Sequence, residues 1–231
     1  MKRSKAVFIA STDTGVGKTV VTGLFGRFLL SRGLNAIPQK WIQTGGVTAL
    51  DAFRHLGLMR ITGDDIKKHI AHISPYIFKF AASPHLAALR EGRRIDKGKI
   101  ERSFKHLCSE FDHVLVEGIG GGLVPFNKKD MVIDIAAKLK LPVIIVAANR
   151  LGAINHTLLT VEAIKRRGMK ILGVVFNDQR KKENPVILKD NIRIIREITG
   201  QRVLGRLPWI KNEAALYRAF LPIGRKIYKV L

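Results

Sequence analysis

The chain has 231 residues, of which 46% are hydrophobic, and its formal net charge at pH 7 is +23. This hydrophobic content is too high for a disordered chain, and no apolar run approaches the length of about 18 residues that a membrane-spanning helix needs. The basic residues form only short, scattered runs and aromatic residues make up 7% of the chain. We therefore expect a solvated basic surface, with no nucleic-acid partner and no membrane partner.

The chain length suits one large domain, and no linker, internal repeat or low-complexity segment divides it. We therefore predict a single domain over residues 1–231. The single cysteine, Cys108, excludes an internal disulfide and lies in a helix-like run over residues 100–111, where a buried thiol is expected. This cysteine usage and the lack of a membrane segment favour a cytoplasmic location.

Short apolar runs predict strands that are buried on both faces, because they are rich in β-branched residues and do not alternate with polar ones. They are Val7–Ala10, a run through Ile37, Val114–Val116, Val143–Val146 and Val174–Phe176. Helical spacing appears between them at residues 20–29, 154–164 and 188–198, followed by Gly33, Gly168 and Gly200. This alternation predicts an α/β fold with a doubly wound, mostly parallel sheet.

A glycine-rich segment, STDTGVGKT at residues 11–19, connects the first predicted strand to the first predicted helix. This is the layout of a phosphate-binding loop, in which Lys18 reaches the β- and γ-phosphates and Thr19 holds Mg²⁺. The strict pattern requires glycine at position 12, where this chain has Thr12, so the motif alone also fits a chance surface turn. Within the alternating fold, it predicts the architecture of P-loop NTPases.

Polar residues follow the other apolar runs, at the sheet edge where ligands bind in such folds. Glu117 follows a strand and precedes a glycine-rich turn, which predicts a second contact to Mg²⁺, with a loop or helix-capping carboxylate as the alternative. Lys40 can neutralise charge on a phosphoryl group, although an ordinary solvated lysine is the simpler interpretation without further context. Asp51 is likewise a helix-region carboxylate with no special role by itself.

Asn155 follows Gly152 at the start of a predicted helix, where an asparagine is a good N-cap. The same helix N-terminus also suits a substrate carboxylate. Both interpretations stay open from the residues alone.

Together these motifs resemble those of the dethiobiotin synthetase family over nearly the whole chain. The family's phosphate loop, GTDTxVGKT, is similar to STDTGVGKT, and its KPVQTG is similar to KWIQTG at residues 40–45. Further similar segments are SPYIF at 74–78, SPHLA at 83–87, EGR at 91–93, VLVEGIGG at 114–121, LGAINHTLLT at 151–160, GVVFND at 173–178 and GRLPW at 205–209. So many separate segments in the family's order make the resemblance specific.

The resemblance implies an ATP-dependent ligase that joins CO₂ or bicarbonate to 7,8-diaminononanoate and closes the ring of dethiobiotin. In the family, one amine forms a carbamate, the γ-phosphoryl group of ATP activates it as a mixed anhydride, and the second amine attacks. Family members are homodimers that bind the substrate tail across the interface. The alternative is a partitioning-type P-loop switch ATPase that binds DNA or membrane, but those relatives carry a lysine where this chain has Asp13.

By motif match, the resemblance also implies a role for individual residues. Lys18 and Lys40 are expected to be catalytic, and Thr19, Asp51 and Glu117 are expected to hold Mg²⁺. The residues expected around ATP are Thr14, Gly15, Val16, Gly17, Lys18, Thr19, Val20, Asp51, Glu117, Gly118, Ile119, Gly120, Asn177, Asp178, Arg206, Leu207, Pro208 and Glu213. Those expected around the diamine substrate are Thr14, Lys40, Thr44 and Gly118, with Gly152, Ala153 and Asn155 of the other subunit around its carboxylate tail.

The chain departs from the family pattern at three places. Ser11 replaces a glycine and would be strained if its φ were positive. Trp41 and Ile42 replace Pro-Val beside Lys40, and Gly122 stands where some members carry tryptophan. None of these departures falls on a residue expected to act in catalysis.

Overall fold

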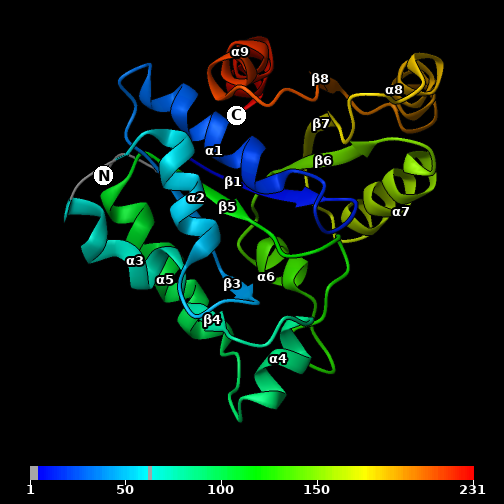
Figure 1. Ribbon diagram of the computed structural model, residues 1–231. Helices are drawn as coiled ribbons and strands as arrows, with labels where there is room; N and C mark the ends of the chain where they lie inside the picture. Colours follow the sequence, from blue (N-terminus) through cyan, green and yellow to red (C-terminus); the bar gives the residue numbers. More distant parts are fainter. Residues whose placement is uncertain (1–4, 62–63) are drawn as a thin grey trace.

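A six-stranded parallel sheet forms the centre of the computed structural model, which describes residues 5–61 and 64–231 (Figure 1). The strand order is β2-β5-β1-β6-β7-β8. These strands are β1 (Lys5–Ser11), β2 (Ala36–Lys40), β5 (His113–Glu117), β6 (Val143–Asn149), β7 (Ile171–Asp178) and β8 (Val203–Leu207). A separate parallel pair consists of β3 (Ile42–Thr44) and β4 (Tyr76–Phe78). The predicted α/β fold is confirmed, and every predicted apolar run lies within a strand.

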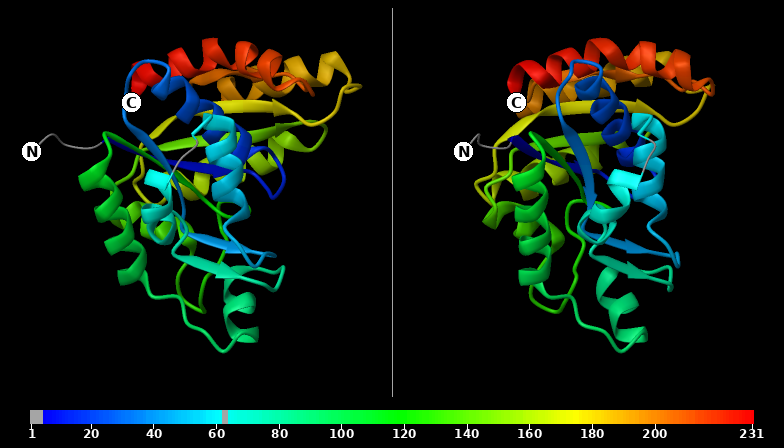
Figure 2. Two further views of the ribbon diagram at one scale, coloured as in Figure 1. Left: turned by 60° about the vertical axis from the view of Figure 1, so that its left-hand side comes forward. Right: turned by 90° about the vertical axis from the view of Figure 1, so that its left-hand side faces the viewer.

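Helices cover both faces of the central sheet (Figure 2). The helices are α1 (Lys18–Leu30), α2 (Leu50–Met59), η1 (Asp64–His69), α3 (Ile70–Ile73), α4 (Pro84–Arg90), α5 (Lys97–Glu110), α6 (Val132–Lys138), α7 (Ala153–Lys165), α8 (Pro185–Thr199) and α9 (Glu213–Val230). Helices α1 and α9 pack on one face, and α5, α6, α7 and α8 pack on the other. Among the helices described, none is both long enough and apolar enough to cross a membrane.

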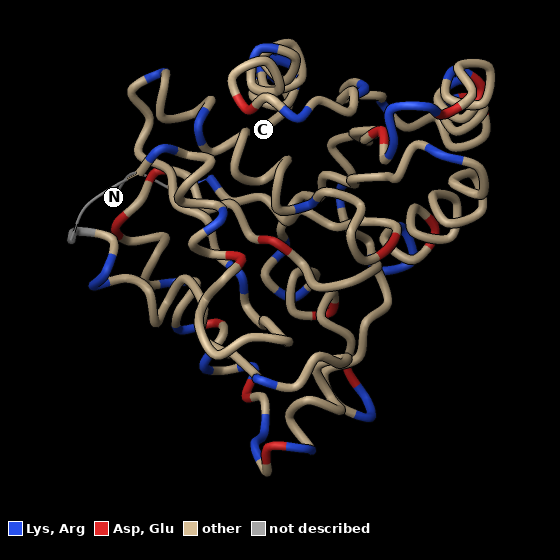
Figure 3. The backbone as a smooth tube through the Cα atoms, in the orientation of Figure 1, with Lys and Arg blue, Asp and Glu red and all other residues tan. Residues whose placement is uncertain are grey.

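Each face of the sheet has its own hydrophobic core, which explains why the strands show no alternation of polar and apolar residues. In β1, Val7 and Ile9 belong to the core under α1 and α9, while Phe8 and Ala10 belong to the core on the other face. Apolar residues are therefore required at every position of a central strand. Lysines and arginines are spread over the elements outside this core, in keeping with the scattered basic runs of the sequence (Figure 3).

The predicted helices lie within α1, α7 and α8, but two local expectations need correction. Asn155 is not the N-cap of α7, because Gly152 takes that position with a φ of 84° and the helix begins at Ala153. Gly152 turns the chain into the helix three residues before Asn155, so Asn155 falls in the first turn. Cys108 lies on α5 as predicted but is half-buried rather than fully buried.

Candidate active site

The phosphate-binding loop leaves β1 at Ser11 and enters α1 at Lys18. Gly15 and Gly17 adopt φ values of 73° and 97°, in the left-handed region that favours glycine. Asn177, at the end of β7, holds the loop in place, since its side-chain amide donates to the carbonyl of Val16 at 2.8 Å. The loop thus lies fixed at the N-terminus of α1, which is a favourable place for an anion.

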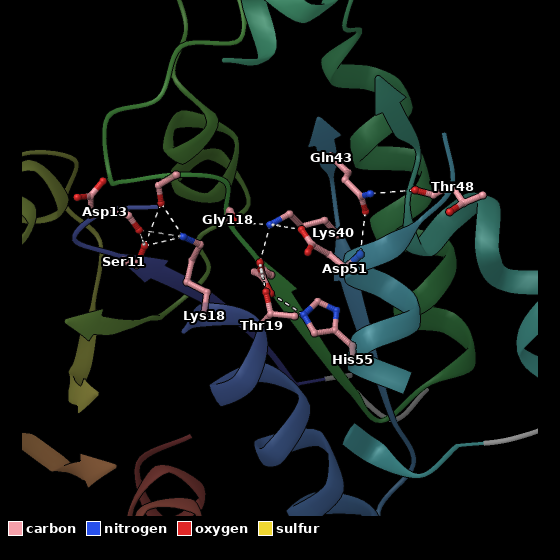
Figure 4. A network of polar contacts seen from close by, with 12 residues as sticks. Ser11, Asp13, Lys18, Thr19, Lys40, Gln43, Thr48, Asp51, His55 and Gly118 are labelled. Atoms are coloured by element: carbon pink, nitrogen blue, oxygen red, sulfur yellow. Dashed lines mark hydrogen bonds and ion pairs between the residues drawn. The ribbon is translucent and has the colours of Figure 1, made fainter. Parts of the chain in front are cut away.

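Lys18 is buried beneath this loop, with its ammonium group among oxygen acceptors (Figure 4). Nζ donates to Oγ of Ser11 at 2.7 Å and to the carbonyl of Gly120 at 2.8 Å, and it lies 3.3 Å from the carbonyl of Asp13. Burial, together with the nearby ammonium of Lys40, lowers the pKa of Lys18 to about 8. No carboxylate contacts this ammonium among the described hydrogen bonds, so a phosphate would supply the negative charge that it lacks.

Ser11 occupies the first position of the loop without backbone strain. It is the last residue of β1, and the non-glycine residues with positive φ in the described chain are Arg60 and Lys140. The strain that we considered for this serine therefore does not arise, because the loop turns after the strand has ended. The Ser11 hydroxyl lies 2.7 Å from the carbonyl of Asp13 and 2.9 Å from that of Gly120, and it donates to one of them while accepting from Lys18.

Lys40, at the end of β2, is buried among acceptors instead of being solvated (Figure 4). Its Nζ lies 2.5 Å from Oε1 of Glu117, 3.1 Å from Oδ2 of Asp51 and 2.9 Å from the carbonyl of Gly118. Burial opposes the charge, but Glu117 and Asp51 outweigh it and raise the pKa of Lys40 above its ordinary value. The side chain is therefore a permanent cation beside the phosphate-binding loop.

Glu117 is the last residue of β5, and its side chain contacts both the end of the loop and helix α2. Thr19 donates from Oγ1 to Oε1 of Glu117 at 3.2 Å, and Nε2 of His55 lies 2.5 Å from Oε2. Burial alone raises the pKa of Glu117, but Lys40 and His55 hold the pKa of this carboxyl well below its ordinary value. The carboxylate is therefore ionised and fixed by its neighbours.

The three side chains expected to hold Mg²⁺ come together around Lys40. Thr19 contacts Glu117, and Asp51 shares the ammonium of Lys40 with Glu117. Their donors are one hydroxyl and two carboxylates, the oxygen ligands that Mg²⁺ prefers when phosphates and waters complete its shell. The described residues contain no group of three or more His, Cys, Asp or Glu placed to hold a metal, and a site of this kind needs none. The donor set fits Mg²⁺.

Two side chains of this site, His55 and Gln43, were not predicted from the sequence. His55 lies one helical turn after Asp51 on α2, and this spacing on one helix face is the signal that would have found it. Gln43, in β3, accepts from the backbone N–H of Asp51 at 3.0 Å and donates to the carbonyl of Thr48 at 2.9 Å. It thereby holds the start of α2, and with it Asp51, against the sheet edge.

A cavity of about 630 Å³ adjoins the loop beside α9. Of the residues expected around ATP, Val20, Asn177, Asp178, Leu207, Pro208 and Glu213 line it. Trp209 and Arg54 also line it and were not predicted. Arg206 does not line the cavity, because its guanidinium is paired with Asp178, with Nη2 2.8 Å from Oδ2. The volume is in the range of small-molecule sites.

The other expected ligand residues lie on the turns around the loop and at α7. Gly118, Ile119 and Gly120 form the turn after β5, Thr14 lies exposed in the loop, and Thr44 ends β3. Gly152, Ala153 and Asn155, at the N-terminus of α7, do not line the cavity beside α9, and no described hydrogen bond joins them to Lys40. A hollow of about 290 Å³ lies between the loop and α7.

The two remaining departures from the family pattern have simple surroundings. Trp41 is fully buried and stacks on Phe8 with a centroid distance of 5.5 Å, so it anchors the end of β2 and faces the core. Gly122 lines the hollow beside α7, and a Cβ there would meet the side chain of Thr160 at 3.5 Å, an ordinary contact. Neither residue contacts the ammonium of Lys40 in the described structure.

The parallel sheet, the phosphate-binding loop and the buried carboxylate on the neighbouring strand define a P-loop nucleotide-binding protein. Solved structures agree with this class. The cell division ATPase MinD of Pyrococcus furiosus matches with a TM-score of 0.61 and 18% identity, covering 99% of this chain and 100% of that one. The MinC:MinD cell division protein complex of Aquifex aeolicus matches with a TM-score of 0.61 and 14% identity, covering 98% of this chain and 96% of that one. Identities this low show the fold alone.

Sequence comparison identifies the family within this class. The family model AAA_26, described as an AAA domain, matches residues 5–215. The ATP-dependent dethiobiotin synthetase BioD 2 of Haemophilus influenzae is 37% identical over 190 residues, covering 81% of this chain and 98% of the relative. The ATP-dependent dethiobiotin synthetase BioD of Halalkalibacterium halodurans is 39% identical over 212 residues, covering 89% and 85%. The chain belongs to the family of ATP-dependent dethiobiotin synthetases and is an ATP-dependent ligase.

Proposed function

We propose that this protein forms dethiobiotin from 7,8-diaminononanoate and CO₂ or bicarbonate, converting ATP to ADP and phosphate. The observation that carries the proposal is the pair of buried ammonium groups, Lys18 and Lys40, at the ends of the phosphate-binding loop and β2. An acid that is activated by phosphorylation brings two anionic groups together, the γ-phosphate and the carbamate. One cation for each anion is what such a reaction requires.

The proposed reaction has three steps. One amine of the substrate adds to CO₂ and loses a proton, which gives a carbamate. A carbamate oxygen attacks the γ-phosphorus of ATP, and ADP leaves. The second amine then attacks the carbonyl carbon, inorganic phosphate leaves and the ring closes.

The surroundings of the two lysines support a separate role for each. Lys18, whose partners in the described structure are a hydroxyl and backbone carbonyls, binds the β- and γ-phosphates. Lys40, held protonated by Glu117 and Asp51, faces the carbamate and the mixed anhydride. Both act mainly by positioning and by offsetting negative charge as it moves between the reactants.

Thr19, Asp51 and Glu117 would hold Mg²⁺, which offsets phosphate charge when bound. In the cavity beside α9, Asn177, Asp178, Leu207 and Pro208 would surround the adenine, with Val20 below it and Glu213 at the start of α9. Arg206 acts through Asp178, whose carboxylate it pairs, instead of contacting the nucleotide directly.

We further propose that the chain acts as a single-domain homodimer in the cytoplasm, with the N-terminus of α7 serving the active site of the other subunit. Large apolar side chains lie exposed around that helix end: Leu123, Leu151 and Leu159 are 55%, 74% and 56% exposed. A second subunit on this surface would cover them. Its Gly152, Ala153 and Asn155 would then offer a helix N-terminus to the carboxylate tail of the substrate.

The direct test measures phosphate release from MgATP with and without 7,8-diaminononanoate and bicarbonate. Release that requires both, together with a product of the mass of the cyclic urea, supports the proposal. Release that is indifferent to the diamine and stimulated by DNA or lipid vesicles would contradict it and favour a partitioning-type ATPase.

A further inference from the structure

A groove lined by basic residues lies at the sheet edge opposite the candidate active site. It has a volume of about 780 Å³ and lies between the starts of β7 and β8 and the ends of α8 and α9. Its lining residues are Lys170, Ile171, Leu172, Arg196, Gly200, Gln201, Arg202, Val203, Lys229 and Val230. We call it the basic groove. The same two strands end at the nucleotide cavity, where Asp178 and Leu207 line the wall.

The charge of the basic groove is uncompensated in the described structure. Four of its lining residues are cationic, and none is acidic: Lys170, Arg196, Arg202 and Lys229. All four are exposed, and none of them makes an ion pair or a side-chain hydrogen bond with a described residue. Arg193, one turn before Arg196 on α8, contrasts with them because it is paired with both Asp190 and Glu197.

Helix ends do not account for this charge. The C-termini of α8 and α9 each carry an effective charge of about −0.5, so together they offset about one of the four positive charges. Lys165 already serves the end of α8, since its Nζ donates to the carbonyl of Thr199 at 3.3 Å. Most of the positive potential in the groove therefore remains, and it favours a bound anion in this concave site.

We propose that the basic groove binds a compact anion that carries several phosphate groups. The guanidinium groups of Arg196 and Arg202 suit phosphate oxygens in a bidentate arrangement, and Lys170 and Lys229 add point charges around them. The lining contains no aromatic side chain on which a nucleobase would stack, so recognition falls on the phosphates alone.

This site is separate from the nucleotide cavity. From Ile171 to Asp178, β7 advances seven residues at about 3.3 Å each, so the two sites lie about 23 Å apart along the strand. An anion in the basic groove therefore does not block ATP, and the proposal does not depend on which reaction the active site catalyses.

Calorimetric titration with inorganic tripolyphosphate tests the proposal, with excess ADP present to fill the nucleotide cavity. The groove variant is Lys170→Gln with Arg202→Gln. The control variant is Arg94→Gln with Lys105→Gln, which removes the same charge from exposed positions outside both sites. We expect one tripolyphosphate per chain in the wild type and the control, and binding weaker by about tenfold or more in the groove variant. Added salt should weaken the binding.

Equal affinity in the groove and control variants would overturn the proposal, and so would binding that disappears when ADP is added. A single-stranded RNA of about 12 nucleotides is the competing ligand. If it binds more tightly than tripolyphosphate, and the groove variant loses this binding, the ligand is a nucleic acid and the proposal of a compact anion is wrong. If the groove variant melts at a lower temperature than the control, Arg196→Gln with Lys229→Gln provides the same comparison.

Discussion

The hydroxyl of Ser11 accepts a hydrogen bond of 2.7 Å from Nζ of Lys18, so the first residue of the phosphate-binding loop holds the lysine that the loop presents to a nucleotide. Both side chains also contact the carbonyls of Asp13 and Gly120. Lys18 thus lies among uncharged acceptors, some of which it would exchange for phosphate oxygens in the proposed complex with ATP.

Ser11→Ala should strengthen nucleotide binding and lower the stability of the nucleotide-free protein. In the wild type, the hydrogen bond from the charged Lys18 stabilises the nucleotide-free protein by about 1.5–3 kcal/mol. The alanine variant lacks this bond, and contacts of Lys18 with the phosphates would regain part of that energy when a nucleotide binds. We expect ADP affinity to rise about threefold to tenfold, with a lower melting temperature without nucleotide. Calorimetry and thermal melts measure the two effects. Weaker ADP binding in Ser11→Ala would show instead that the hydroxyl helps to hold the phosphates.

The lowered pKa of Lys18 predicts a pH-dependent stability. The unfolded chain keeps this proton up to its ordinary pKa of 10.5, while the folded protein loses it near 8, so the unfavourable charge is fully present below about pH 8. Lys18→Met should therefore stabilise the nucleotide-free protein near about pH 7, by up to about 3 kcal/mol. The gain should shrink between about pH 8 and 10.5, where the wild type sheds the proton.

Urea denaturation of Lys18→Met and the wild type at about pH 7 and about pH 9.5 measures this difference. Lys105→Met, at an exposed position on α5, is the control and should show little change at either pH. A gain for Lys18→Met that is the same at both values would contradict the burial of a charged Lys18.

Lys40→Gln should abolish turnover while largely sparing nucleotide binding, because the proposed partner of this cation is the carbamate. Removing the ammonium leaves the buried Glu117 with one charged partner fewer, which costs about 3 kcal/mol of folding stability or more. ADP affinity should change by less than about threefold. An equal loss of ADP affinity and turnover, in a variant whose thermal melt shows it folded, would remove Lys40 from its carbamate role.

His55→Leu should weaken Mg²⁺ binding through Glu117, since the imidazole fixes one carboxylate oxygen at 2.5 Å. Loss of such an outer partner costs about 10-fold or more in metal affinity. Titration of Mg²⁺ into the ADP-bound protein measures the effect. ADP binding without Mg²⁺ is the internal control and should stay unchanged. An unaltered Mg²⁺ affinity would show that His55 only packs in the core and does not support the Mg²⁺ site.

Mixing two inactive variants tests whether the active site is shared between subunits. Lys40→Gln removes the cation that is proposed to act in catalysis, and Asn155→Asp places a negative charge where the substrate carboxylate is expected. Each variant alone should be inactive or nearly so. If the tail binds across the interface, exchanged heterodimers contain one intact site, and random mixing restores about a quarter of wild-type activity. No recovery after confirmed subunit exchange would place both residues in the same subunit's site.

Several features of this protein were readable along the chain. Five strands of the central sheet, the helices α1, α5, α7 and α8 and the loop from Ser11 to Thr19 were predicted, because they depend on residue spacing and on where glycine allows a turn, which are local properties. The strands β3, β4 and β8 and the helix α9 were not predicted. Thr19 and Lys18 were placed at the loop for the same reason. Asn155 was misplaced as a cap because Gly152, only three residues earlier, starts the helix first.

The contacts that make the site depend on tertiary structure. Lys40 and Glu117 are 77 positions apart, and they meet because β5 lies beside β2 in the sheet, with Lys40 and Glu117 in register. His55 reaches the same carboxylate only because α2 packs against that strand edge. The four cations of the basic groove come from four separate segments of the chain, and they lie together only because these segments meet at the starts of β7 and β8. Sequence spacing determined the elements and the loop, whereas burial and charge pairing depend on which strands become neighbours, and only the folded sheet decides that.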